Sequence, residues 1–323
     1  MELMSWGIQG VEDMSTEAFD VVVVGNVGID SNVYLHTDTL ETNRETHFTE
    51  NLDYVGQSGG FTSRGFAQLK KRTAFIGYVG DDYSGRFLRQ EFARDGIDTT
   101  ALFIDPFGTN RSVNLMYPDG RRTSFFDGKG HMHLKPDLEI CRRVLARTRL
   151  AHFSIPNWAR LLLPVARELG LTISCDLQDV VSLPDTYRQD FIDASDILFF
   201  SAVNYEDPSF LIREVLQSHP GRIVIVGMGS RGCAVGTQEG IRFFAAVPGE
   251  SPIIDTTGAG DGLAVGFLSS FVMDGYSLEE SVLRGQITAR YTCSQKASSS
   301  HLITKELLDE QFRKLKLGTN PSS

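Results

Sequence analysis

Short apolar runs recur along the chain and are separated mostly by segments of helix length. The first run is the four valines at 21–24, which end at Gly25 and are typical of a strand buried on both faces. Segments between the runs, such as 84–96 and 161–170, have the length and apolar spacing of helices. This alternation predicts an α/β fold with a mostly parallel sheet flanked by helices. The later strand-like runs are TAFIGYVG, LAHFSI, LTISCDL, DILFFS and RIVIVGMG.

Two stretches, 32–56 and 101–128, interrupt this alternation because they lack helical periodicity. The YPDGRR segment in the second stretch predicts a hairpin turn, since Pro118 presets one turn dihedral angle and Gly120 tolerates another. We therefore expect both stretches to form a small accessory sheet that acts as a lid over a cleft. The expected organisation is a loose extension at 1–19, one domain at 20–317 and a disordered tail at 318–323.

Composition narrows the class of protein without identifying its activity. Hydrophobic residues at 41% and charged residues at 22% are ordinary for a globular domain, and the four cysteines form no CxxC pair. A formal net charge of −10 disfavours nucleic acid and anionic membranes as partners, because phosphate groups bind to cationic surfaces. The N-terminus lacks a secretory pattern, and the longest apolar stretch is shorter than the ~20 residues of a membrane helix. These features predict a cytoplasmic protein.

One glycine-rich segment matches the GxGxxG pattern of dinucleotide-binding proteins at 227–232. That pattern requires a helix to begin inside it, so that the pyrophosphate lies at the helix N-terminus. Here the segment CAVGTQEGIRFFAAV follows, which alternates in polarity and turns at TQEG. We expect a hairpin at this place and no dinucleotide site.

A second glycine-rich segment, DTTGAGD at 255–261, precedes the apolar run GLAVGFL. Small residues before a helix leave several backbone N–H groups free near the positive end of the helix dipole, which suits an anion. Asp261 has the wrong charge to bind that anion, so its position favours a general base that accepts a proton from an attacking hydroxyl group. The alternative is that Asp261 caps the helix and the glycines form a tight turn.

The DTTGAGD segment resembles the second signature of the ribokinase-like PfkB family of carbohydrate and nucleoside kinases, matching each of its fixed positions. The resemblance implies a three-layer α/β/α fold with a β-sheet lid, and it implies ATP and magnesium as cofactors. It also implies that Asp261 is the catalytic base, and that family members often bind potassium beside Asp255 and Thr257. The implied anion hole is the backbone of Gly258, Ala259, Gly260 and Asp261.

On the substrate side, VVVVGNVGID resembles the first strand of the family, which implies that Asp30 and Asn26 bind substrate hydroxyl groups. A polar turn is the alternative for both residues. The asparagine of the first family signature is replaced by Phe61 or by Arg64, depending on the alignment. A phenyl ring would stack on a base or a sugar, whereas a guanidinium would meet an anionic substrate. The remaining substrate candidates, which would allow close approach or form a turn, are Gly59 and Gly60.

On the nucleotide side, IVIVGMGSRGCAV resembles the family's nucleotide-binding strand and turn. The family's N-x-x-E motif is altered here, with a serine and an asparagine at the two fixed positions and Glu206 close by as a magnesium ligand through water. The nucleotide-binding candidates are Gly227, Gly229, Gly232, Ser201 and Asn204.

Four basic residues lie in the expected lid and face two interpretations. They can meet a phosphate group of the substrate, or they can be solvated surface charges, which we favour because no pattern sets them apart. These residues are Arg111, Arg121, Arg122 and Lys129.

Together these features predict an ATP-dependent kinase that phosphorylates a hydroxyl group of a small sugar-like molecule. The alternatives are a nucleoside kinase of the same family, suggested by Phe61, and a non-catalytic ligand-binding relative, suggested by the altered motifs. An exposed apolar face on the lid would favour a homodimer.

Overall fold

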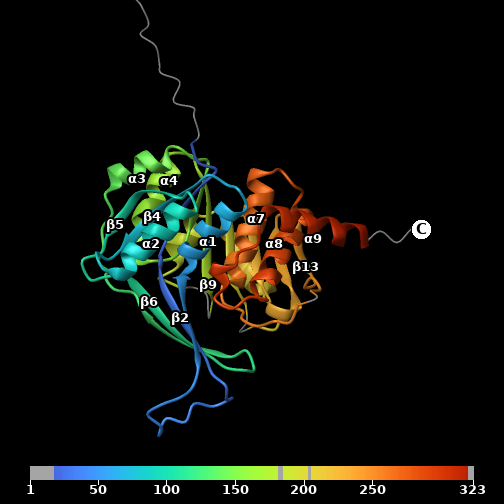
Figure 1. Ribbon diagram of the computed structural model, residues 1–323. Helices are drawn as coiled ribbons and strands as arrows, with labels where there is room; N and C mark the ends of the chain where they lie inside the picture. Colours follow the sequence, from blue (N-terminus) through green and yellow to red (C-terminus); the bar gives the residue numbers. More distant parts are fainter. Residues whose placement is uncertain (1–17, 181–184, 203–204, 250, 319–323) are drawn as a thin grey trace, which may run out of the picture.

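The computed structural model describes residues 18–180, 185–202, 205–249 and 251–318, and a nine-stranded sheet forms its centre (Figure 1). Neighbouring strands from β11 to β5 run parallel, whereas β12 and β13 pair antiparallel at one edge. This confirms the mostly parallel sheet. The strand order is β13 (Gly240–Phe244), β12 (Cys233–Thr237), β11 (Ile223–Gly227), β10 (Ile197–Ser201), β9 (Thr172–Asp179), β8 (Leu150–Phe153), β1 (Val21–Val24), β4 (Thr73–Val79) and β5 (Asp98–Ile104).

Helices cover both faces of this sheet, which explains why its strands are apolar without interruption. Side chains alternate along β1, so that Val22 packs in one core cluster with Trp158 while Val23 packs in the other with Phe267. The three-layer architecture is therefore confirmed. The first layer contains α3 (Leu138–Leu145), α4 (Leu163–Glu168), α5 (Gln189–Ala194) and α6 (Ser209–Ser218), and the second contains α1 (Ser58–Gln68), α2 (Tyr83–Arg94), α7 (Ala259–Leu268), α8 (Leu278–Thr292) and α9 (Lys305–Gly318).

A separate four-stranded sheet, the lid sheet, extends from the main body (Figure 1). Its order is β3 (Glu50–Gly56), β2 (Gly28–Tyr34), β6 (Asn110–Met116) and β7 (Arg122–Asp127). The expected turn joins β6 to β7, with Gly120 at φ 86° and its N–H donating to the Tyr117 carbonyl. One expectation is wrong: residues 101–104 belong to β5 of the main sheet, because Ala101 and Leu102 are buried in its two core clusters.

Three further expectations concern the GxGxxG segment, membrane helices and the two ends of the chain. The GxGxxG segment leads into the antiparallel hairpin of β12 and β13, as predicted. No helix in the described ranges has the length and apolar character needed to cross a membrane. The proposed N-terminal extension and C-terminal tail fall largely on residues 1–17 and 319–323, which lie outside the described residues, and so does Asn204.

Candidate active site

The N-terminus of α7 is open and lacks a side-chain cap. Gly258 adopts a left-handed conformation with φ 80°, which a glycine tolerates without a steric cost, and α7 begins at Ala259. Within the described ranges, the N–H groups of Gly260 and Asp261 have no acceptor, and a methyl group at Gly260 would meet no atom within 4 Å. This helix end therefore presents free donors to an open space, as an anion site requires.

Asp261 lies in the first turn of α7 but does not cap the helix, which removes the capping alternative. Its Oδ1 atom accepts a hydrogen bond of 2.6 Å from Oγ of Ser58, the first residue of α1. Desolvation and the negative charges of Asp176 and Asp30 raise the pKa of Asp261 well above its usual range, against the opposing effect of Arg122. Asp261 is thus a carboxylate with more affinity for a proton than an ordinary aspartate.

Asp30 lies on β2 of the lid sheet, and desolvation raises its pKa to about 6. Its carboxylate accepts a hydrogen bond of 2.7 Å from Nε2 of Gln57, which also donates to Oγ of Ser112 at 2.8 Å. Asn26 lies between β1 and β2, is half-buried, and accepts a backbone hydrogen bond from Gly60. Gln57 and Ser112 were not predicted from the sequence, because their contacts join β2, β6 and the segment between β3 and α1, which lie far apart along the chain.

Gly59 and Gly60 lie in the first turn of α1, so neither forms the turn that we considered. A methyl group at Gly59 would lie 2.5 Å from the Asn26 carbonyl oxygen, and one at Gly60 would lie 3.0 Å from the side chain of Val27. These glycines therefore allow α1 to approach the chain between β1 and β2. Gly59 and Gly60 thus lie close to other parts of the protein, and they help to position the site without a shown contact to substrate.

Phe61 and Arg64 are buried residues of α1, which opposes their direct use in substrate binding. Phe61 is 4% exposed, and a methyl group at Gly258 would lie 2.6 Å from its ring. Arg64 forms ion pairs with Glu91 at 3.2 Å and with Asp95 at 2.5 Å. The phenyl ring thus supports the turn before α7, and the guanidinium is already neutralised by two carboxylates.

Arg122 is the first residue of β7, and its Nη1 atom donates a hydrogen bond of 3.0 Å to Oγ1 of Thr257. Its positive charge lowers the pKa values of both Asp30 and Asp261. Within the described part of the chain it forms no ion pair, whereas its neighbour Arg121 pairs with Asp119. Arg122 is thus an exposed residue that also contacts the turn before α7, so both interpretations of its charge stay open.

The side-chain oxygens of Asp255 and Thr257 are already engaged in hydrogen bonds to the protein. The Asp255 carboxylate is 2% exposed and accepts hydrogen bonds from Asn32 Nδ2, Tyr34 Oη and the Thr257 backbone N–H. Thr257 accepts from Arg122 through its hydroxyl group and from Ser298 through its carbonyl group. These contacts connect the lid sheet to the turn before α7 and leave the donor set a poor fit for potassium.

The nucleotide candidates gather where parallel strands end. Ser201 of β10 pairs with Gly227 of β11 and with Asp179 of β9, so the carboxyl ends of these strands lie side by side. Gly229 and Gly232 follow in a tight turn with φ 60° and 96°. Ligands of open α/β sheets bind outside such strand ends.

The donor set for magnesium is sparse. Of the residues that the structure describes, no three or more His, Cys, Asp or Glu side chains form a metal-binding group. The side chains of Asp179 and Glu206 are exposed near the strand ends. Two exposed carboxylates fit an ion that keeps most of its water and binds chiefly to phosphate groups.

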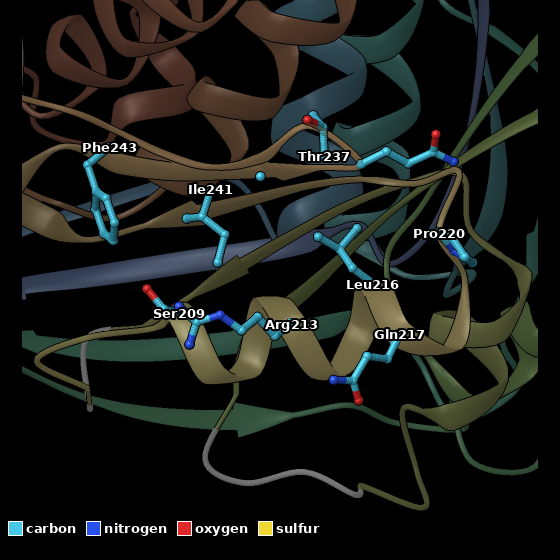
Figure 2. A pocket seen from close by; sticks show the side chains of 10 residues that line it. Ser209, Arg213, Leu216, Gln217, Pro220, Thr237, Ile241 and Phe243 are labelled. Carbon is cyan, nitrogen blue, oxygen red and sulfur yellow. The ribbon is translucent and has the colours of Figure 1, made fainter.

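Two surface cavities lie apart from Asp261. One, of about 740 Å³, separates α6 from the hairpin of β12 and β13, where Arg213 and Leu216 lie opposite Ile241 (Figure 2). The other, of about 700 Å³, lies between the N-terminus of α2 and the lid sheet and includes Phe125 and Lys129. Arg111 and Lys129, two of the basic lid residues, line the second cavity, but Asp261 and the residues predicted to bind substrate hydroxyl groups or nucleotide line neither, so neither is the candidate active site.

The known proteins to which this chain is similar in sequence are sugar kinases and related phosphotransferases. The profile of the pfkB family carbohydrate kinases matches residues 175–305. An acarbose 7(IV)-phosphotransferase from Actinoplanes is 30% identical over 91% of this chain and 98% of its own. An ATP-dependent ribose-1-phosphate kinase from Halopiger xanaduensis is 27% identical over 90% of this chain and 99% of its own.

Solved structures extend this likeness to the fold. A microbiome-derived acarbose kinase is similar with a TM-score of 0.83 and 28% identity, covering 91% of this chain and 99% of that one. The Arabidopsis thaliana ribokinase, solved with ribose and ATP, is similar with a TM-score of 0.77 and 20% identity, covering 92% and 99%. The three-layer architecture with its lid sheet is therefore that of the ribokinases.

Proposed function

Because the chain belongs to the PfkB family of carbohydrate kinases, we propose that it transfers the γ-phosphoryl group of ATP to a hydroxyl group of a sugar-like molecule. The observation that carries this proposal is the position of Asp261 at the open N-terminus of α7, with its pKa raised. A kinase needs a base beside an anion site, and a protein that only binds its ligand does not.

In the proposed reaction, Asp261 takes the proton of the acceptor hydroxyl group while the hydroxyl oxygen attacks the γ-phosphorus of ATP. The bond to the β-phosphate oxygen breaks, and ADP leaves with the electron pair. The free N–H groups of Gly260 and Asp261 then donate to the oxygens of the transferred group, where negative charge develops. Asp30 and Asn26 are the proposed partners of other substrate hydroxyl groups.

Magnesium, when bound to the ATP phosphates, would supply further neutralisation of charge. The residues proposed to hold it through water are Glu206 and Asp179, whose exposed carboxylates lie near the proposed nucleotide end. Gly227, Gly229, Gly232 and Ser201 are the proposed contacts of the nucleotide. Potassium is not part of the proposal, because the side-chain oxygens of Asp255 and Thr257 already have protein partners.

A substrate panel tests this function. We expect the protein to release ADP with at least one uncharged sugar among sugars, sugar phosphates and nucleosides, because the buried Phe61 offers no open ring for a base. ADP release can be followed by a coupled assay and the product identified by mass spectrometry. ADP release with nucleosides alone would favour the nucleoside kinase, and ATP binding without transfer to any compound would favour a non-catalytic protein.

The pH dependence follows from the raised carboxyl pKa values. We expect kcat/KM to fall as the pH drops through about 6, the pKa of Asp30, because Asp30 must be ionised to accept hydrogen bonds from the substrate. The pKa of Asp261 is raised as well, and Asp261 must be ionised to take the proton of the acceptor hydroxyl group. The Tm, in contrast, should rise as the pH drops. A carboxyl group whose pKa is raised by folding holds its proton more tightly in the folded state, so protonation stabilises the fold.

Both quantities can be measured between about pH 5 and 8. The control is Asp30→Asn, which should make the acid limb of kcat/KM less steep. It should also move that limb to lower pH, because the Asp30 charge raises the pKa of Asp261. A kcat/KM that stays constant over this range would contradict the assigned base.

A further inference from the structure

Gln57 joins the end of β3 to the start of α1 and has an unusual backbone conformation. Its φ of 67° and ψ of 155° lie in a region that residues with a side chain rarely occupy. Residues held in such conformations cluster at functional sites, where surrounding contacts keep them in place. The contacts that hold Gln57 are therefore informative.

Gln57 donates three hydrogen bonds, and its backbone carbonyl oxygen accepts a fourth from the Phe61 N–H. Its Nε2 atom donates to Oδ1 of Asp30 at 2.7 Å and to Oγ of Ser112 at 2.8 Å, and its backbone N–H donates to Oδ2 of Asp30 at 3.4 Å. A carboxylate only accepts hydrogen bonds, so the amide nitrogen must face Asp30. Both amide hydrogens are then used, and among the described residues the carbonyl Oε1 has no partner.

Gln57 lies beside both the proposed substrate-binding residue Asp30 and the residue that contacts the proposed base Asp261. Its side chain holds Asp30, while the next residue, Ser58, donates to Asp261. Gln57 is itself half-buried, so part of it is accessible to solvent. An unpaired carbonyl oxygen there is an acceptor for a hydroxyl or amine group of the substrate.

Apart from Arg122, whose charge also acts on Asp30, the basic residues of α1 and the lid named above lie beside carboxylates of the protein. Arg64 is neutralised by two carboxylates, and Arg111, Arg121 and Lys129 lie within 4 Å of Asp53, Asp119 and Asp127, respectively. Arg122 is directed to Thr257 at the phosphate end. A substrate phosphate or carboxylate beside Gln57 and Asp30 would thus meet like charge and an unpaired acceptor.

We infer that Gln57 is a specificity-determining residue that, with Asp30, restricts the acceptor to uncharged or amine-bearing sugars and disfavours sugar phosphates and sugar acids. This inference rests on the proposed kinase function and specifies its substrate class. The strained backbone is retained because it aims the carboxamide at Asp30 and Ser112.

The test compares Gln57→Gly with Lys70→Gly, because Lys70 is an exposed residue with φ 62° just beyond the other end of α1. Both changes relieve a positive φ, but only the first removes the carboxamide. We expect Gln57→Gly to lower kcat/KM for the best uncharged sugar by about tenfold, mainly by raising KM. The Tm of this variant should not show a matching loss of stability. Its preference for that sugar over the corresponding sugar phosphate should shrink, and Lys70→Gly should leave both quantities unchanged.

Ser112→Ala gives a second reading without a change of backbone, since it frees one amide hydrogen of Gln57 and should reduce the preference by about threefold. Unchanged selectivity in both Gln57→Gly and Ser112→Ala would overturn the inference, and so would a wild-type protein that prefers sugar phosphates. Failure of the kinase function itself is distinguishable, because the wild-type protein would then release no ADP with any compound.

Discussion

Replacing Asp261 with asparagine is expected to lower kcat by about 10³-fold or more while ATP and sugar still bind. The amide keeps the shape of the carboxylate and can still contact Ser58, but it cannot take the proton of the acceptor hydroxyl group. The base is also unusually suited to that task, because desolvation and the charges of Asp176 and Asp30 raise its pKa. Single-turnover phosphoryl transfer and calorimetric binding of each ligand separate the chemical step from binding.

The matched control is Asp81→Asn, which removes an equal charge from a side chain that is 86% exposed. That variant should retain wild-type kcat. Asp261→Asn with near-normal turnover would remove Asp261 as the base. Equal losses of turnover and of ligand binding would instead assign it to binding.

Arg122→Gln is expected to lower kcat/KM for ATP by about 10²-fold, the second largest effect that we predict. Arg122 carries a charge without an ion-pair partner in the described part of the chain, and it contacts Thr257 just before the open end of α7. A cation at that place can neutralise the γ-phosphate as charge develops on it. The glutamine variant retains a polar side chain but removes the charge.

Binding measurements make this prediction specific. Affinity for ATP should fall more than affinity for ADP, because only ATP has the phosphoryl group that Arg122 is proposed to meet. Arg121→Gln is the control, since Arg121 is the adjacent residue, is exposed and pairs with Asp119. Equal loss of ATP and ADP affinity, or an equal defect in the Arg121 variant, would argue against a contact with the γ-phosphate.

The sequence predicted the features that depend on local patterns. The apolar runs correspond to the strands of the main sheet, and DTTGAGD corresponds to an uncapped helix start with an acid in its first turn. The error at 101–104 arose because a short apolar strand looks the same in either sheet until its neighbours are known.

Features that depend on distant contacts were not predictable from the sequence. Arg122 and Thr257 lie 135 positions apart, and nothing in the residues around Arg122 distinguishes it from Arg121. Likewise, Arg64 is neutralised by residues 27 and 31 positions away, which the pattern of the first signature does not reveal. The strained backbone of Gln57 has no sequence signal, because the residue itself is common in ordinary conformations.

The bonds of Asp255 bear on how such proteins are recognised in genomes. Asp255 opens the DTTGAGD motif, yet two of its three hydrogen-bond donors, Asn32 and Tyr34, lie on β2 and outside that motif. A chain that kept the motif but lost these donors would hold a buried carboxylate with too few partners, which is costly. Annotation by the motif alone would accept that chain, so the two lid residues are a useful second criterion for a competent phosphate loop.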